Sequence, residues 1–239
     1  MAFVAGWMTL VVALVSPVHQ LGAMLFSVHM TQHELLMIIA APLLVIGRPL
    51  ISFLWALPQS WRENIGSWTK IHSVSAIWEA LTTPLFVWLL HGATVWLWHI
   101  PSLYQASVEQ ESVHALQHTM MLGTALLFWW TLIHGRFGRV TSGVAVLYVF
   151  TTAVHTSILG ALMTFAQRVW YPIYNGRTAA CHLSALQDQQ LGGLIMWVPA
   201  GSVFIILGLW LVAAWIRESE NRVVYSRSET LASRGSHVA

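Results

Sequence analysis

Charged residues are scarce in this sequence of 239 residues. Asp, Glu, Lys and Arg together make up 8% of it, whereas roughly 25% is usual for a soluble domain. Hydrophobic residues make up 56%, and the mean hydropathy is +0.65. This balance excludes an ordinary soluble domain and predicts a polytopic membrane protein. The formal net charge of +2 is too small to predict a nucleic-acid partner.

Cysteine is almost absent too. The single Cys181 excludes an intrachain disulfide and any metal site built on a pair of cysteines. A signal-peptide pattern is also missing, because neither Lys nor Arg precedes the first apolar run; we therefore expect that run to stay as a transmembrane helix. Histidine, by contrast, is abundant: there are 12, against 11 Lys and Arg combined.

The apolar runs predict an all-α bundle of six membrane-spanning helices. We expect them at about residues 2–16, 22–47, 84–99, 107–135, 142–166 and 184–216. Residues 48–79 are expected to form a loop with an interfacial segment. The bundle is thus one transmembrane domain, residues 1–216, and the charged, Ser-rich tail of residues 217–239 is expected to be disordered.

Two of the expected helix starts carry a capping-box pattern. Ser107 is followed three residues later by Gln110, and Ser184 by Gln187. In such a box the two side chains bond each other's backbone N–H groups at the first turn. The pattern therefore predicts starts for the fourth and sixth helices at these serines.

The basic residues predict an orientation in the membrane. With six helices, Arg168 and Arg177 lie on one side, and nine lie on the other: Arg48, Arg62, Lys70, Arg136, Arg139, Arg217, Arg222, Arg227 and Arg234. Loops rich in Lys and Arg stay in the cytoplasm. We therefore expect a multi-pass protein of the bacterial plasma membrane with both termini cytoplasmic. The loops at 17–28, 100–111 and 167–187 would face the periplasm.

Two pairs of histidines open the second and fourth predicted helices. His29 and His33, like His114 and His118, are four residues apart, so each pair shares one helix face. Ionisable groups in a membrane segment are costly and point to a functional site. A single such pair could equally hydrogen-bond a neighbouring helix, but both pairs lie at the outer ends of their helices and at similar depth.

Other candidate groups fall at the same outer end. Imidazole and carboxylate groups without cysteine suit copper, zinc, iron or nickel. The candidate metal ligands, for one or two ions, are His29, His33, His114, His118, His155 and Asp188. His99 and Glu34 are candidate catalytic residues, because a histidine beside a metal can pass a proton and Glu34 adjoins His33. His19 is expected to be a loop residue outside the site.

Several motifs recur together along the membrane portion. The chain resembles the CtaG family of caa3-type cytochrome c oxidase assembly factors in the segments His29-Met-Thr-Gln-His33, Ala41-Pro-Leu-Leu-Val-Ile-Gly47, Trp96-Leu-Trp-His-Ile-Pro101, His114-Ala-Leu-Gln-His118, Leu159-Gly-Ala-Leu162, Tyr171-Pro-Ile-Tyr174 and Asp188-Gln-Gln-Leu-Gly-Gly-Leu-Ile-Met-Trp197. Members of that family are often drawn with seven helices, so an N-terminal helix would be absent here.

The resemblance implies copper as the metal and a link to haem-copper oxidase assembly. Oxidase subunits or copper carriers would then be partners, besides the lipid bilayer. Soft sulfur ligands usually serve copper(I) handover, whereas His and carboxylate suit an ion that changes oxidation state. The alternative is therefore a copper oxidoreductase acting on a small outer-face substrate such as superoxide. A metal transporter ranks last, because few polar residues continue toward the cytoplasmic side.

Overall fold

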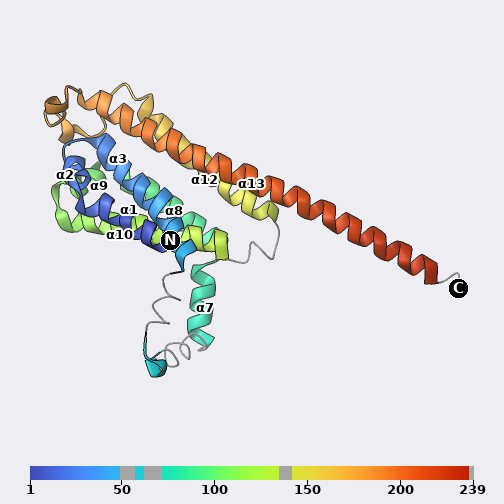
Figure 1. Ribbon diagram of the computed structural model, residues 1–239. Coiled ribbons are helices and arrows are strands. Elements are labelled where there is room, and N and C mark those ends of the chain that lie inside the picture. Colours follow the sequence, from blue (N-terminus) through green and yellow to red (C-terminus); the bar gives the residue numbers. More distant parts are fainter. Residues whose placement is uncertain (49–56, 62–71, 135–141, 237–239) are drawn as a thin grey trace.

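The computed structural model describes residues 1–48, 57–61, 72–134 and 142–236, with side chains as far as residue 220. Within these ranges the regular structure is entirely helical, which confirms the all-α prediction. The helices pack side by side, and α13 continues far beyond the others (Figure 1).

The N-terminal fifth of the chain is broken into short helices. It contains α1 (Ala2–Val15), α2 (Pro17–Gly22), α3 (Phe26–Glu34), the π-helix η1 (Leu35–Ala40) and α4 (Ala41–Gly47). Proline favours the first turn of a helix, and α2 begins at Pro17, with the Ser16 hydroxyl accepting from the Val18 N–H at 3.2 Å. The expected start of the second helix at residue 22 is wrong: α2 ends there, and a turn precedes α3.

The π-helix η1 comes just before Pro42. Proline lacks an N–H, and its ring crowds the carbonyl four residues earlier; in the turn just before it, the Ala41 N–H bonds Leu36 O, five residues back. The indole Nε1 of Trp129 donates to the carbonyl of Met37 at 2.8 Å, so that carbonyl is satisfied from another helix. π-Helical turns are often found at functional sites, and this one directly follows His33 and Glu34.

The central part contains α7 (His72–Leu81), α8 (Pro84–Trp98), α9 (Pro101–Glu109) and α10 (Glu111–His134). The expected start of a helix at Ser107 is wrong. Ser107 lies inside α9, and its hydroxyl donates to Tyr104 O at 2.7 Å rather than capping a new helix. Gln110 has an extended backbone, which ends α9 and lets α10 begin afresh.

The C-terminal part contains α12 (Ser142–Thr164), the 3-10 turns η2 (Pro172–Tyr174) and η3 (Thr178–Cys181), and α13 (Ala185–Ser236). The second capping box is confirmed: the Gln187 N–H donates to Ser184 Oγ at 3.2 Å, and the Ser184 N–H to Gln187 Oε1 at 2.9 Å. The helix runs through residues 217–236, where composition predicts disorder. That segment contains no proline, and its one glycine is Gly235, so nothing local stops it.

Three helices are long and apolar enough to cross a membrane: Phe26–Gly47, Gly143–Thr164 and Ala185–Glu220. Ser73–Leu81 and Pro84–Trp98, bent by 57°, make a fourth if they count as one span, and Ala2–Val15 is a shorter apolar helix. Helices occur at all six expected positions, but six crossings and cytoplasmic termini stay predictions. Of the residues that set the predicted orientation, Arg62, Lys70, Arg136 and Arg139 lie outside the described ranges.

Glycines let α12 and α13 approach closely. A Cβ on Gly193 would lie 2.6 Å from Thr164 N and 2.8 Å from Gly160 O, both backbone atoms. Small residues permit such close backbone contact between membrane helices. Of this pair, α13 also packs on α3. The two helices thus form the side of the bundle against which α3 lies.

We expect Gly193→Ala to lower the melting temperature in detergent, because the added methyl group must push two backbones apart, at a cost of about 1–3 kcal/mol. The matched control is Gly208→Ala in the same helix, where a Cβ meets nothing within 4 Å of the described residues. The control should be neutral or slightly stabilising, since alanine is the better helix former. Equal melting temperatures for the two variants would contradict the close packing.

Candidate metal centre

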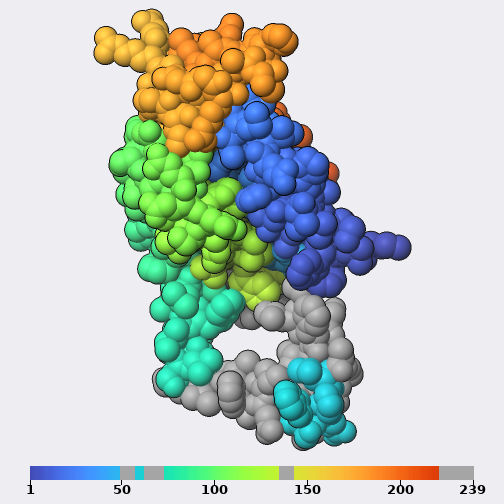
Figure 2. All heavy atoms as spheres, turned by 90° about the vertical axis from the view of Figure 1, so that its left-hand side faces the viewer, coloured from blue at the N-terminus to red at the C-terminus, as the bar shows by residue number. Residues whose placement is uncertain are grey.

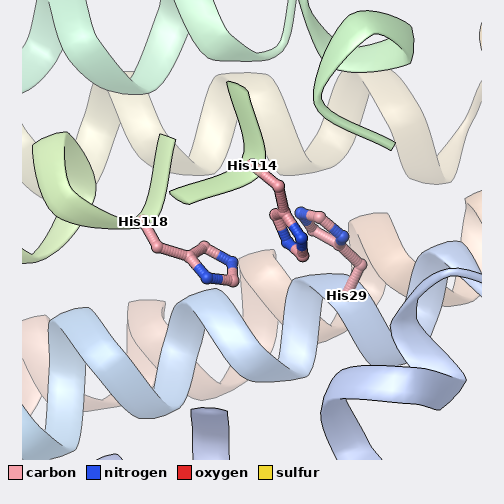
Figure 3. Close-up of side chains that lie close together, drawn as sticks. All are labelled: His29, His114 and His118. Atoms are coloured by element: carbon pink, nitrogen blue, oxygen red, sulfur yellow. The ribbon is translucent and has the colours of Figure 1, made fainter. Parts of the chain in front are cut away.

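Three histidines from two helices point toward one another in Figure 3. His29 comes from α3, and His114 and His118 come from α10. One ring nitrogen of each lies within 4.8 Å of one ring nitrogen of each of the others. The helix period explains why one helix supplies two ligands, because residues four apart lie one above the other.

The spacing of these three rings would allow them to bind the same metal ion. An ion about 2.0–2.1 Å from an imidazole nitrogen lies about 3.2 Å from the ring centre, so ligands at tetrahedral or trigonal angles have ring centres about 5–5.5 Å apart. The observed separations are 5.1 Å for His29–His114, 5.8 Å for His29–His118 and 4.2 Å for His114–His118. Small side-chain movements would bring all three into one coordination sphere.

Two further histidines lie next to these three. The ring centre of His33 lies 4.5 Å from that of His29 and 5.3 Å from that of His118. His99, which ends α8, lies 6.3 Å from His33. We call His29, His33, His99, His114 and His118 the five-histidine cluster. Four of its five members were expected as metal ligands, and His99 as a catalytic residue.

The cluster holds buried ring nitrogens that lack a hydrogen-bond partner among the described residues. They are Nε2 of His29, His99, His114 and His118, and both nitrogens of His33. His29, His33 and His99 are at most 3% exposed. A buried polar atom left unsatisfied costs about 1–3 kcal/mol, and such atoms are rare in native proteins. Their concentration at one point is what a bound cation would relieve.

Asp188 has other contacts. Its two carboxylate oxygens accept hydrogen bonds from the Phe26 N–H at 2.6 Å and the Ser27 N–H at 3.1 Å, and from the Ser27 hydroxyl. These donors are the first turn of α3, where unsatisfied N–H groups favour a negative charge. Asp188 was expected as a metal ligand; its position instead supports a role in holding α3, and with it His29, in place.

His155 and Glu34 lie apart from the three converging ligands. The His155 ring is 5.8 Å from Trp88 and faces Gly92, whose missing side chain leaves it room. Glu34 and His91 both line a small cavity. The space in it that the centre of a water molecule can occupy is about 20 Å³, enough for one water molecule. Neither residue contributes to the group of three ring nitrogens.

His19 lies beside the site, although we expected it to be a loop residue outside the site. It lies in α2, with its ring stacked 5.1 Å from His114. The Gln32 amide nitrogen lies 3.2 Å from His19 Nδ1; since an amide N–H only donates, Nδ1 accepts and the proton of the neutral ring is on Nε2. The same amide donates to Ala13 O at 2.7 Å. A glutamine between His29 and His33, inside an expected membrane helix, was the sequence signal that could have indicated a polar partner.

Buried tyrosines support the cluster from the connection between α12 and α13. Tyr171 donates its hydroxyl to His99 O at 2.8 Å, and Tyr174 donates to Gly22 O at 3.0 Å. Burial raises the pKa of both phenols, so they stay neutral and keep donating. Figure 2 shows this connection, in orange, lying over the blue N-terminal helices and the green α10.

Comparison with known proteins agrees with the motifs. The family described as "Cytochrome c oxidase caa3 assembly factor (Caa3_CtaG)" matches residues 1–218. The chain belongs to the CtaG family. The match includes every residue of the five-histidine cluster, together with Asp188 and His19.

Similar curated proteins come from mycobacteria. Uncharacterized proteins of Mycobacterium tuberculosis and Mycobacterium bovis are each 28% identical over 233 residues, which cover 93% of this chain and 35% of theirs. A Mycobacterium leprae protein is 27% identical over 235 residues, covering 91% and 35%. The chain thus spans about a third of the length of these relatives. No solved structure matches the chain significantly.

We expect Asp188→Asn to lower the melting temperature, because hydrogen bonds to a charged group contribute about 1.5–3 kcal/mol each and the amide would turn donors toward the α3 N–H groups. Ser27→Ala, which removes one of the donors, should lower it less. Both variants should still bind as much metal per folded protein as the unmodified chain. Loss of metal at an unchanged melting temperature would instead identify Asp188 as a ligand.

Proposed function

We propose that this CtaG-family protein binds copper in the five-histidine cluster and supplies it during assembly of cytochrome c oxidase. The observation that supports the proposal most directly is the convergence of His29, His114 and His118, whose Nε2 atoms are buried and without hydrogen-bond partners in the described parts of the chain. Copper is the cargo in this proposal. The residues fit it, because imidazole is a good ligand for copper.

Family membership selects copper among the metals that imidazole binds. Zinc, iron and nickel share the same ligand preference, so the ligands alone do not choose. An assembly factor for cytochrome c oxidase works on an enzyme whose metal centres include copper, and a histidine site in such a factor has an evident cargo. The absence of carboxylate among the three converging ligands also argues against a hard-cation site.

Exposure is graded across the site, and this suits a transfer role. His29 is 1% exposed, His118 is 8% exposed, and His114 and His19 are partly exposed. The site therefore opens on the side of His114 and His19. In the orientation that the basic residues predict, this opening faces the periplasm, where a copper carrier or an oxidase subunit could reach the ion.

A second candidate function follows from the ligand chemistry. All three converging ligands are imidazoles, and the single cysteine, Cys181, is exposed in η3. A site without sulfur holds copper(II) as readily as copper(I), as an oxidoreductase acting on superoxide would require. His19, whose Nε2–H lies on the ring stacked beside His114, would then hydrogen-bond the oxygen species and orient it.

We expect His114→Ala to bind at least tenfold less copper at a fixed free-copper concentration, because one of three converging ligands is lost. His114 is only partly buried, so the variant should fold. The control is His182→Ala, an exposed histidine in the α12–α13 connection, which should bind copper as the unmodified chain does. Metal analysis of the purified, copper-loaded proteins measures the difference, and full copper content in His114→Ala would contradict the site.

The assembly role predicts a copper-dependent defect in cells. Deleting the gene should reduce cytochrome c oxidase activity severalfold, and excess copper in the medium should restore part of it. The unmodified gene should complement the deletion, whereas the His114→Ala gene should not. Normal oxidase activity in the deletion strain, combined with copper-dependent superoxide consumption by the purified protein, would overturn the assembly role in favour of the oxidoreductase.

A further inference from the structure

His99 has a fixed tautomer. Its Nδ1 lies 2.6 Å from the carbonyl oxygen of Val95, one turn earlier in α8. A carbonyl can only accept, so Nδ1 carries the proton of the neutral ring and Nε2 is left with a free lone pair. Histidines that bind metals commonly donate their other N–H to a backbone carbonyl in this way, which orients the ring and raises its basicity.

The lone pair on His99 Nε2 is buried, and a hydrogen bond from Tyr171 fixes the His99 backbone. His99 is 3% exposed, and its Nε2 finds no partner among the described residues. The Tyr171 hydroxyl bonds the His99 carbonyl oxygen at 2.8 Å, which fixes the point where α8 ends. His99 is thus a preorganised donor, although it is not one of the three histidines that converge near the mouth.

His33 supplies a second lone pair at a suitable distance. For two imidazoles on opposite sides of one ion, the ring centres would be about 6.4 Å apart, twice the distance of about 3.2 Å from metal to ring centre. The observed separation of His33 and His99 is 6.3 Å, with the ring planes at 80°. Both nitrogens of His33 lack partners within the described ranges, so one can serve this ion.

We propose that His33 and His99 form a second, inner copper(I) site with two ligands in near-linear coordination. Copper(I), a singly charged ion with a filled d shell, readily accepts two ligands in a line, whereas zinc, which also has a filled d shell, prefers four. The proposal rests on the proposed function for the identity of the metal, and it adds a stoichiometry of two ions and a coordination number for the second.

The inner site gives the cluster a direction. We call the three converging histidines, His29, His114 and His118, the outer site. The ring centre of His33 lies 5.3 Å from that of His118 and 4.5 Å from that of His29, so His33 can exchange an ion with two ligands of the outer site. His99 contacts His33 and is 3% exposed, whereas His114 is partly exposed. An ion between His33 and His99 would enter after the outer site and leave through it.

The test counts copper in the full-length protein loaded with copper(I) under a reductant and washed free of excess. We expect two copper ions per unmodified chain and one in His99→Gln. The matched control is His91→Gln, a buried histidine of the same helix whose Nδ1 bonds Thr124 at 3.0 Å; it should keep two. X-ray absorption should show the mean number of nitrogen ligands rising in His99→Gln, as the two-coordinate ion is lost.

Each outcome separates the inner site from the proposed function. One ion in both the unmodified chain and His99→Gln would overturn the inner site and leave the outer site standing. No copper in the unmodified chain would overturn both proposals. If His99→Gln does not fold, His33→Gln takes its place, with the same loss of one ion expected and two retained ions overturning the proposal.

Discussion

The carboxylate of Asp188 fixes the first turn of α3, and the position of the candidate metal ligands depends on it. It accepts from two backbone N–H groups and a hydroxyl of residues 26 and 27, and is wholly buried. His29 follows within the same turn. Helix α13 carries Asp188 and also packs closely on α12 through glycine. The ligands of α3 are therefore held against the two helices that make the most extensive contact with each other.

A second constraint acts at the other end of α3. Residues 35–40 form a π-helix directly before Pro42, and Trp129 of α10 donates to the carbonyl of Met37 at 2.8 Å. That bond ties the segment after His33 to the helix that carries His114 and His118. The two ligand-bearing helices are therefore joined below the site by a hydrogen bond and at the site by the imidazoles. Burying unsatisfied imidazoles between them is costly, which is why a bound ion would stabilise this arrangement.

Local sequence patterns predicted what depends on helix periodicity. The four-residue spacing predicted that His29 would face His33 and that His114 would face His118, and the capping box at Ser184 predicted the start of α13. The same kind of pattern failed at one place, where another local contact is formed instead. Ser107 has the same local pattern as Ser184, yet its hydroxyl bonds Tyr104 O, and the chain turns three residues later.

Roles that depend on contacts between distant segments could not be read from spacing. Asp188 was expected as a ligand because it lies at the correct end, but 162 positions separate it from the Phe26 N–H that it accepts from. His19 was assigned to a loop because α2 has only six residues, too few for a periodic signal. Which residues share a face of one helix was predictable, whereas their neighbours from other helices were not.

The length of α13 gives the protein an unusual reach. Its 52 residues, at 1.5 Å each, make a rod of about 78 Å, more than twice the hydrocarbon thickness of about 30 Å. One end of this rod holds the turn that carries His29, and the other end projects well beyond the rest of the molecule (Figure 1). A protein bound at the far end of α13 would therefore contact the same continuous helix that holds the first turn of α3.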